Sequence, residues 1–477
     1  MKHRILYFAF FLLIKSIGFS QSTYNLQKLI PTDSDEYDFF GNSINISNDL
    51  LIIGARNDFI NGIASGSAYI YKYVNNIWVE QSKILPNDGD DFNYFGYSVS
   101  ISGDYAIISS KVNNSYSSDT SAVYFFQYLN NVWTQIQKFN VNNGYFDFAS
   151  NSVSISGDYA VFGANNINTV YVFYNNSGNW EIDTIITPFD GQNEDNYGQA
   201  LCISNNLLIV GSSQDDDIAS GSGSAYIYMH DNYEWQFETK ITASDGANNN
   251  WFGRAVSICG DYAIIGADKY LTSGAQAGSA YIFHKNDSMW EEQAILTPSN
   301  SFLGDQFGHS VGITNNYAIV GAPSDNNISN HKRGSSYVFF NNNSNWEEIH
   351  ILLASDADDD DFFGKSLAIS GDNIVVGAPG DDDYGDNSGS AYSYNLYLQN
   401  ISELDSEHDK YIYPNPTTGI INIKAEGIER IKVMNIEGKQ IYNGKENKID
   451  LSIQPKGIYI IKIIADKQTI TKKLIKQ

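Results

Sequence analysis

The sequence is poor in the residues that mark several other protein classes. It contains only two cysteines and nine prolines in 477 residues. Since a secreted disulfide scaffold is much richer in cysteine, Cys202 and Cys259 are interpreted as two small buried apolar side chains. No segment keeps helical apolar spacing over three turns, and after the N-terminal segment no apolar run is long enough to cross a bilayer. We therefore expect a mature chain that is neither helical nor membrane-spanning.

Recognisable catalytic motifs are also missing. The seven histidines are scattered, and there is no histidine pair at metal-ligand spacing, no phosphate-binding glycine loop and no nucleophile-elbow serine. His309 follows a glycine in a turn and is the histidine best placed for a pocket, but it is interpreted as an exposed turn residue and not as a catalytic one. We therefore assign no catalytic residues.

The residues that are abundant are typical of β-structure. Aromatic residues make up 14% of the chain, and 33 of them are tyrosines. Asparagine is also very common. This combination predicts half-buried strands joined by polar turns.

The first 21 residues have the organisation of a secretory signal peptide. Two basic residues precede an apolar run from 5 to 14, and small or polar residues follow it. Lys15 ends the run before it reaches the roughly 20 apolar residues that a membrane anchor needs. No cysteine lies near the expected cleavage position, which argues against a lipoprotein. We expect residues 1–21 to be removed on export.

An internal repeat is the strongest signal in the sequence. An aromatic residue followed by glycine recurs six times, and a degenerate copy, Phe148-Ala149, fills the one gap. Successive landmarks are 49 to 56 residues apart, which defines seven units of near-constant length. The intact landmarks are Phe40-Gly41, Phe95-Gly96, Tyr197-Gly198, Phe252-Gly253, Phe307-Gly308 and Phe363-Gly364.

Each unit contains four strand-like segments. In the second unit these are 98–102, 105–108, 122–126 and 133–139, and the first alternates polar with apolar residues. The turn between the first two strands is Gly-Asp, Asn-Asp or Asn-Asn, which suits the positive φ angles of two-residue hairpin loops. Four antiparallel strands repeated seven times predict an all-β, seven-bladed β-propeller. A linear solenoid would need polar capping repeats, and none is visible.

The two ends of the repeat array complement each other. The last unit stops after its third strand, at 390–394, and lacks the fourth strand that opens with tryptophan in the other units. Residues 24–31 mirror that missing strand, because they resemble 78–86. We predict that this N-terminal strand closes the ring and that the propeller spans residues 22–398.

The units resemble FG-GAP repeats, because the landmark is followed by a Gly-Ala pair. Phe40-Gly41 is followed by Gly54-Ala55, and Phe363-Gly364 by Gly377-Ala378. Such repeats form the propellers of α-integrins and of many bacterial surface proteins, so the resemblance implies an integrin-like β-propeller. In that family some blades carry a calcium loop between the first two strands. Here this connection is a tight turn in every unit, and no Arg-Gly-Asp motif is present.

The tail, residues 411–477, follows a linker at 399–410 and alternates like a small β-sandwich. It resembles the C-terminal sorting domain of the type IX secretion system of Bacteroidetes-type bacteria. The resemblance implies that the tail engages the type IX secretion machinery, and that the protein is secreted or displayed on the outer membrane exterior of a Gram-negative bacterium. The matching residues include Pro414, Asn415, Pro416, Gly419, Gly457, Tyr459 and Lys473.

The net charge of −26 is unevenly distributed. Residues 411–477 hold 12 basic against 6 acidic residues, so the propeller is more acidic than the whole chain. A nucleic-acid partner would require the opposite sign and is excluded. In a four-stranded antiparallel blade, connections 2–3 and 4–1 emerge on one face. More than half of the propeller's acidic residues fall in these connections, and we call this face the acidic face.

The most acidic connections belong to the seventh unit and suggest a calcium site, the one cofactor that we consider. Asp381, Asp383 and Asp386, with Asp358 from the preceding connection, offer carboxylate oxygens on loops with a glycine at a bend. The alternative is a solvated acidic loop that keeps the protein soluble. The spacing does not fit the twelve-residue helix-loop-helix motif, which favours the alternative.

Four further residues are candidates for ligand contact on the acidic face: Asp215, Asp217, Asp359 and Trp251. Trp251 is interpreted as replacing a polar residue immediately before Phe252. The other tryptophans open the fourth strands at equivalent positions, which indicates a structural role. They are Trp78, Trp133, Trp180, Trp235, Trp290 and Trp346.

These observations favour a monomeric, non-enzymatic binding or adhesion protein. Its acidic face would contact an extracellular protein or glycan whose identity the sequence leaves open. A secreted polysaccharide hydrolase acting through rim carboxylates is the first alternative. A structural component of the cell envelope is the second.

Overall fold

The computed structural model describes most of the propeller and much of the tail. The expected signal peptide and the linker lie outside the described residues. Those residues are 27–60, 63–88, 93–111, 121–140, 152–192, 194–231, 233–268, 277–287, 289–300, 302–325, 332–396, 412–413, 417–423, 428–435, 439–465 and 468–476.

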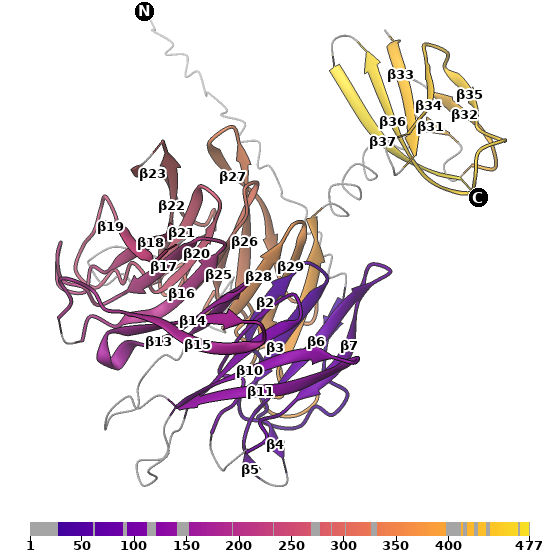
Figure 1. The fold of residues 1–477 in the computed structure, drawn as a ribbon. Coiled ribbons are helices and arrows are strands. Elements are labelled where there is room, and N and C mark those ends of the chain that lie inside the picture. Colours follow the sequence, from indigo (N-terminus) through magenta and orange to yellow (C-terminus); the bar gives the residue numbers. More distant parts are fainter. Residues whose placement is uncertain are drawn as a thin grey trace, which may run out of the picture.

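Between residues 27 and 396, the described residues form seven four-stranded antiparallel sheets, the blades of a β-propeller (Figure 1). Blade 1 contains β2 (Phe40–Ser47), β3 (Leu50–Ala55), β6 (Ser67–Val74) and β7 (Ile77–Ile84). Blade 2 contains β8 (Ser98–Ser102), β9 (Tyr105–Ser110), β10 (Ala122–Leu129) and β11 (Val132–Asn140). Blade 3 contains β12 (Val153–Ser156), β13 (Tyr159–Ala164), β14 (Thr169–Asn176) and β15 (Asn179–Ile186). Blade 4 contains β16 (Tyr197–Ser204), β17 (Leu207–Ser212), β18 (Ser224–His230) and β19 (Trp235–Ile241). Blade 5 contains β20 (Ala255–Cys259), β21 (Tyr262–Ala267), β22 (Ser279–Asn286) and β23 (Met289–Leu296). Blade 6 contains β24 (Ser310–Ile313), β25 (Tyr317–Ala322), β26 (Ser335–Asn342) and β27 (Asn345–Leu352).

Blade 7 combines strands from both ends of the propeller. Its inner three strands are β28 (Ser366–Ser370), β29 (Asn373–Ala378) and β30 (Ser390–Asn395). Its outer strand is β1 (Gln27–Leu29), which pairs antiparallel with β30. The N-terminal strand therefore completes the last blade, as the missing fourth strand predicted.

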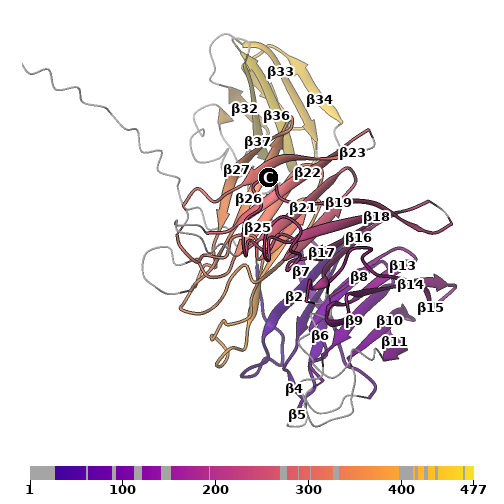
Figure 2. The ribbon, with the colours of Figure 1, turned by 90° about the vertical axis from the view of Figure 1, so that its left-hand side faces the viewer.

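The first strands of successive blades form a closed inner ring. Neighbouring inner strands contact each other in the order β2, β8, β12, β16, β20, β24 and β28, and β28 contacts β2 again. Figure 2 shows the blades from the side. Serine hydroxyls on one inner strand accept hydrogen bonds from backbone N–H groups of the next, as Val99 N–H donates to Ser43 Oγ at 3.0 Å. The alternating serines therefore satisfy an edge that would otherwise be unpaired.

The aromatic-glycine landmark lies where two blades come into closest contact. A Cβ atom built on Gly266, the next-to-last residue of β21, would lie 1.9 Å from the carbonyl oxygen of Gly308 in the next blade. The same contact recurs between Gly54 and Gly96, at 2.1 Å. Real Cβ atoms do not approach oxygen so closely, so each of these positions requires glycine while the blades keep this spacing.

The degenerate landmark has a matching change in its neighbour. Ser109 is the next-to-last residue of β9, at the position that Gly54 and Gly266 occupy in their blades. Its expected partner, Ala149 of the degenerate landmark, lies outside the described residues. Both members of this one glycine pair are therefore replaced in the sequence.

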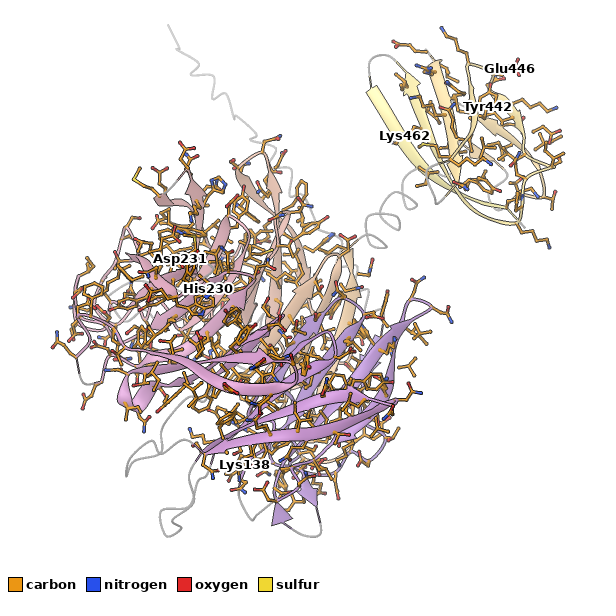
Figure 3. The ribbon with its side chains drawn as sticks, in the orientation of Figure 1. Lys138, His230, Asp231, Tyr442, Glu446 and Lys462 are labelled. Atoms are coloured by element: carbon orange, nitrogen blue, oxygen red, sulfur yellow. The ribbon has the colours of Figure 1, made fainter. Side chains whose placement is uncertain are left out.

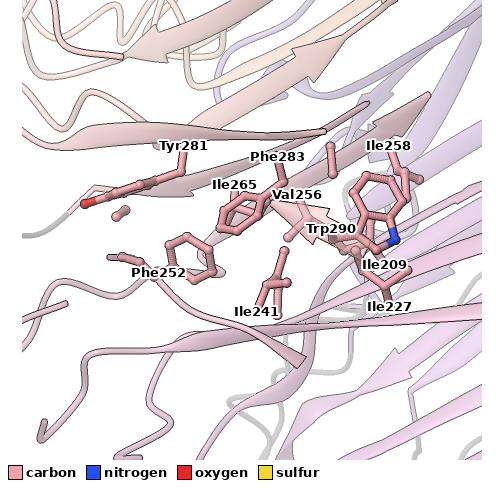
Figure 4. Packing of buried hydrophobic residues seen from close by; sticks show 14 of the residues in the cluster. Ile209, Ile227, Ile241, Phe252, Val256, Ile258, Ile265, Tyr281, Phe283 and Trp290 are labelled. Carbon is pink, nitrogen blue, oxygen red and sulfur yellow. The ribbon is translucent and has the colours of Figure 1, made fainter. Parts of the chain in front are cut away.

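A buried apolar cluster fills each space between neighbouring blades. Figure 4 shows the cluster between blades 4 and 5, where Ile209 and Ile227 of blade 4 belong to the same cluster as Val256 and Phe252 of blade 5. The landmark aromatic is fully buried and packs edge-on against a tyrosine of its own blade, as Phe252 does against Tyr281 at 5.2 Å. Burial of one such ring contributes about 1.5–3 kcal/mol, so the repeat of this contact is a main source of stability.

The turns between the first two strands have the predicted conformation. In every blade except blade 6 their first residue is left-handed, with φ of 55° at Gly103 and 54° at Asn205. The carbonyl oxygen of the second turn residue accepts a hydrogen bond from the third strand, as Asp104 O does from Tyr128 N–H at 2.8 Å. Glycine and asparagine recur here because they adopt this conformation at low cost.

The tail forms two sheets around a core of its own. That core includes Ile421, Ile431, Val433, Ile461 and Leu474. One sheet contains β31 (Ile412–Tyr413), β32 (Ile420–Ile423) and β35 (Lys448–Asp450), and the other β34 (Gln440–Gly444), β33 (Ile428–Asn435), β36 (Gly457–Ala465) and β37 (Gln468–Lys476).

Helical structure is minor among the residues that the structure describes. The 3₁₀-helix η1 (Asn165–Ile167) connects β13 to β14, and a small hairpin, β4 (Phe59–Ile60) with β5 (Ile63–Ala64), extends a connection of blade 1. In the part of the chain that the structure describes, no helix has the length and apolar character needed to span a bilayer.

The glycine contact between blades generates a stability prediction. Gly266→Ala should lower the free energy of unfolding by about 2 kcal/mol or more, because its methyl group overlaps the carbonyl of Gly308. Gly246→Ala is the control, since its nearest contact, Ala243 O, would be 3.2 Å away, and it should change stability by less than about 1 kcal/mol. Urea denaturation followed by circular dichroism measures both. Equal stabilities of the two variants would contradict the role of this contact.

Candidate functional site

The 2–3 and 4–1 connections lie together on one face, the acidic face. Backbone bonds join them between neighbouring blades, as Tyr37 N–H donates to Asp386 O at 2.7 Å and Trp251 N–H to Gly221 O at 3.1 Å. The antiparallel strand order predicts this arrangement. The described parts of the acidic connections therefore lie side by side on this face.

In blade 7, a lysine lies among the carboxylates that were predicted to bind calcium. Lys28 Nζ, on the closing strand β1, lies 2.8 Å from Asp381 Oδ2 and 2.6 Å from Asp383 Oδ2. It is also 2.9 Å from Asp356 Oδ2, in the preceding 4–1 connection. Although burial alone would lower the pKa of Lys28, its bonds to these carboxylates raise that pKa above the ordinary lysine value. The ammonium group thus supplies the positive charge at the centre of this cluster.

The same arrangement occurs in blade 4 and, with fewer acids, in blade 1. Lys240 Nζ is 2.8 Å from both Asp190 Oδ2 and Asp215 Oδ2, and it also bonds Asp217. Lys83 Nζ is 2.7 Å from Asp33 Oδ2 and 2.6 Å from Asp58 Oδ2.

In blade 2, Lys138 of β11, labelled in Figure 3, pairs with Asp88 at 2.6 Å. These lysines stand at equivalent positions near the end of the fourth strand. We call them the fourth-strand lysines.

Each buried aspartate of these clusters also anchors its own blade. In blade 7, Asp381 accepts hydrogen bonds from Ser390 Oγ at 2.7 Å and Tyr392 OH at 2.8 Å. Asp215 accepts the equivalent bonds from Ser224 and Tyr226 in blade 4. This role is structural, since the carboxylate ties the 2–3 connection to the third strand.

The other predicted calcium ligands bond elsewhere. Asp386 Oδ2 accepts a hydrogen bond from Tyr37 OH at 3.1 Å, and Asp358 N–H donates to Asp361 Oδ2 at 2.7 Å. Within the described residues, no group of three or more His, Cys, Asp or Glu side chains is arranged to hold a metal ion. Calcium binding at Asp381, Asp383, Asp386 and Asp358 therefore stays a prediction, and Lys28 is the competitor that a calcium ion would have to displace.

A second aspartate position in the 4–1 connection was missed at the sequence level. Asp38 and Asp361 are almost fully buried and cap tight turns, as Asp35 N–H donates to Asp38 Oδ2 at 2.8 Å. Burial raises the pKa of each to about 7. Asn93 and Asn250 occupy the equivalent positions of blades 2 and 5, which shows that a neutral side chain fits this turn.

The remaining ligand-contact candidates differ in exposure. Asp215 is buried, Asp217 is exposed beside Lys240, and Asp359 is partly buried, 3.6 Å from the Nε atom of Arg333. Trp251 is partly buried in a left-handed conformation with φ of 59°.

The interpretation of Trp251 as a replacement of a polar residue needs correction. The same left-handed position holds Phe39, Tyr94 and Phe362 in other blades. An aromatic side chain is therefore common there, and the ring of Phe39 lies beneath the guanidinium of Arg56 at 5.2 Å.

The repeated tryptophans are packed between blades. Trp180 of blade 3 lies edge-on to Tyr105 of blade 2 at 5.6 Å, and Trp346 of blade 6 packs in the same way on Tyr262 of blade 5 at 5.7 Å. Their burial agrees with the structural role predicted for them. Cys202 and Cys259 are partly buried free thiols in the inner strands β16 and β20.

A cavity of about 260 Å³ lies on the propeller axis. It is lined by residues in or directly before the inner strands of all seven blades, and among the described residues of this lining there is no aspartate or glutamate. Three cationic or titratable side chains enter it from blades 5, 6 and 7: Arg254, His309 and Lys365. Each of them directly follows a landmark glycine.

The interpretation of His309 as an exposed turn residue is wrong. Its side chain is only 9% exposed, because the chain after Gly308 turns inward to begin β24 on the axis. His309 Nδ1 lies 2.7 Å from Asp268 Oδ2, and Arg254 Nε lies 3.5 Å from the same oxygen. Burial lowers the pKa of His309, so its ring is mainly neutral at pH 7 and Nδ1–H donates to Asp268.

Lys365 is the least compensated cation of the cavity. Burial, together with the nearby charges of Arg254 and Arg56, lowers its pKa to about 8. The sequence signal that could have revealed this cluster is the register of the repeat: the residue after the landmark glycine is Asn42, Tyr97, Gln199, Arg254, His309 or Lys365 in the six intact units.

A second cavity, of about 430 Å³, lies at the turns on the opposite face. Tyr159, Tyr174 and His230 line it, and Figure 3 labels His230. Tyr159 OH and His230 Nε2 are 3.1 Å apart, and both rings pack against Trp235. These contacts belong to the packing between blades 3 and 4.

The described residues of the sorting motif support the tail's own fold. Tyr459 is buried and donates to Pro455 O at 2.7 Å, and Gly419 O accepts from Leu451 N–H at 2.9 Å. Gly457 and Lys473 lie in the paired strands β36 and β37. Pro414, Asn415 and Pro416 lie outside the described residues.

Comparison with known families agrees with the geometry of the blades. FG-GAP repeats match residues 24–71, 78–126, 180–228, 235–283, 290–339 and 346–394. The chain belongs to the FG-GAP repeat family. Each match starts at a fourth strand and ends in the third strand of the next blade, and the unmatched segment contains the degenerate landmark of this FG-GAP propeller.

The tail matches the secretion system C-terminal sorting domain over residues 411–477. This domain indicates export by the type IX system and a secreted or cell-surface location in Bacteroidetes. The FG-GAP propeller is therefore an extracellular module of its bacterium.

Other comparisons add little about activity. No curated protein matches the chain. A crystal structure from Bacteroides uniformis, described as a candidate 6-phosphogluconolactonase, has 12% sequence identity and a TM-score of 0.48, covering 70% of this chain and 90% of that one. A likeness of this size carries no information about activity.

The fourth-strand lysines generate a prediction about stability and calcium. Lys28→Met should destabilise the protein by about 3 kcal/mol, because it leaves three carboxylates, one of them buried, without their cation. Millimolar calcium should recover part of this loss, since the freed oxygens suit a hard cation. Thermal unfolding with and without calcium measures both effects.

The control for this prediction is Lys72→Met. Lys72 pairs with Asp49 at 3.7 Å on the exposed surface, so its removal should change stability by less than about 0.5 kcal/mol. The native protein should be insensitive to calcium, because Lys28 occupies the cluster. A native melting temperature that rises with calcium would contradict this account and support the calcium site predicted from the sequence.

Proposed function

We propose that this protein is a non-enzymatic binding protein of the cell surface or the extracellular medium, and that its acidic face binds an extracellular protein or glycan. The sorting tail supports the location, and the FG-GAP propeller supports a binding scaffold. The face itself is supported by the composition of its loops.

Large apolar side chains are exposed among the carboxylates of the acidic face, and this observation carries the proposal. In the 4–1 connections, Phe189 is 71% exposed and Leu303 67%. In the 2–3 connections, Tyr384 is 60% exposed, between Asp383 and Asp386. Apolar side chains rimmed by charges are typical of surfaces that bind a partner.

The repeat leaves these loops free to vary. The buried contacts that recur from blade to blade involve strands and their ends, whereas Phe189, Leu303 and Tyr384 have no equivalent in neighbouring blades. A rigid scaffold with individual loops suits selective recognition at little cost in folding stability.

The hydrolase alternative has less support. Hydrolysis of a glycosidic bond needs two carboxyl groups, one protonated and one free, that face the substrate. The closest carboxylates of blades 1, 4 and 7 instead share the ammonium group of a fourth-strand lysine. A bridged pair is held ionised and is a poor proton donor. The envelope-component alternative has no specific observation in its favour.

A glycan array and a panel of extracellular matrix proteins test the proposal, with the mature chain as probe and parallel assays for polysaccharide cleavage. Phe302→Ser/Leu303→Ser changes the acidic face and should weaken binding at least tenfold. The matched control is Tyr233→Ser/Met289→Ser, which changes two exposed large side chains at the 3–4 connections of the opposite face. This control should bind like the native chain.

Two results would overturn the proposal. If both variants bind equally well, the acidic face is not the binding surface. If the native chain cleaves a polysaccharide and a single Asp→Asn change on this face abolishes cleavage, the hydrolase alternative is correct.

A further inference from the structure

The axial cavity has a charge opposite to that of the surface around it. The propeller is strongly acidic, yet the side chains that line this cavity include two cations and a histidine, and none of the lining residues that the structure describes is acidic. Two more cations lie near its rim, since Lys111 Nζ and the guanidinium of Arg56 lie 5.0 Å and 6.0 Å from the ring of Tyr97, a lining residue. The cavity is open to solvent.

One carboxylate compensates these charges only in part. Asp268 lies behind the cavity wall, with its side chain 3% exposed, and contacts His309 and Arg254 through the same oxygen, Oδ2. This carboxylate therefore orients the imidazole of His309 and one edge of the Arg254 guanidinium. Lys365 has no ion pair at 4.0 Å or less with a described acid, and repulsion from Arg254 and Arg56 adds to the burial that lowers its pKa.

Such an arrangement is unfavourable while the cavity holds only water. Like charges held together in a partly desolvated space repel one another, and an anion between them removes that cost. The guanidinium fork of arginine and the ammonium of lysine both bind oxyanions well, the former with two parallel bonds. Neutral His309, oriented by Asp268 through Nδ1, presents its Nε2 atom as a further polar contact.

The rest of the wall favours a polar ligand of small size. Asn42, Gln199 and several serines contribute amide and hydroxyl groups, with Tyr97 as the aromatic side chain. A volume of about 260 Å³ is several times the roughly 30 Å³ of one water molecule but lies below the usual range for drug-sized ligands. The cavity therefore suits a single anionic group or one acidic sugar residue, rather than a long chain.

We propose that the axial cavity is a binding site for a carboxylate, sulfate or phosphate group, held by Arg254 and Lys365 with His309 as a neutral partner. This site lies on the propeller axis and is separate from the exposed loop side chains of the proposed function. Its three main residues come from three consecutive blades, and residues of all seven blades line its wall, so the complete cavity requires the closed ring.

Isothermal titration calorimetry on the mature chain tests the proposal at constant ionic strength in chloride. The probes are galacturonate, galactose 6-sulfate, inorganic phosphate and, as the uncharged comparison, galactose. At least one oxyanion should bind with one-to-one stoichiometry, and galactose should not bind. Comparison of the three charged probes distinguishes a carboxylate, a sulfated and a phosphate ligand.

Arg254→Met and Lys365→Met should each weaken oxyanion binding at least tenfold. Lys332→Met is the matched control, because Lys332 is exposed on the acidic face, near the ring of Phe362, and does not line the cavity. It should bind like the native chain. The melting temperature of Lys365→Met in chloride should equal or exceed that of the native protein, because the substitution removes a charge that its neighbours repel. Weaker binding by this variant would therefore not reflect misfolding.

Absence of saturable binding in all three oxyanion arms would overturn the proposal. So would equal weakening by Lys332→Met and Arg254→Met, because binding would then reflect the general charge of the face. Retained binding in both cavity variants would place the anion elsewhere.

Discussion

The close approach of neighbouring blades is the constraint on which the rest of this structure depends. A glycine at the end of one second strand faces the carbonyl of a landmark glycine in the next blade, with no room for a Cβ atom. That spacing buries the landmark aromatics and lets serines of one inner strand bond the next. It also brings seven inner strands around one axis, so that side chains far apart in sequence line a common cavity.

Ring closure and charge balance are linked in blade 7, where the first and last strands of the propeller pair. The closing strand β1 completes blade 7 by pairing with β30, and its Lys28 enters the most acidic pair of connections in the protein. The same lysine–aspartate arrangement in blades 1 and 4 gives each buried carboxylate a cationic partner. The excess charge that remains on the exposed loops is then available for partners and solubility.

The fold could be predicted from the sequence because each blade repeats the same local signals. The strand alternation, the Gly-Asp turns and the missing last strand are visible along the chain, and they predicted the propeller and its closure. The site was harder to predict because its contacts join distant residues. The acids around Asp381 are evident in the sequence, but Lys28, more than 300 positions away, is not an evident partner. His309 was misplaced because the turn that carries it faces the axis, which only the ring geometry determines.

The most direct test of this account is a comparison of the mature chain, residues 22–477, with a chain that lacks residues 22–31. Size-exclusion chromatography with light scattering and thermal unfolding measure the outcome. The truncated chain should associate and melt at a lower temperature, because β30 becomes an open sheet edge and the blade 7 carboxylates lose Lys28. A truncated chain that stays monomeric and melts like the mature chain would contradict the closed ring.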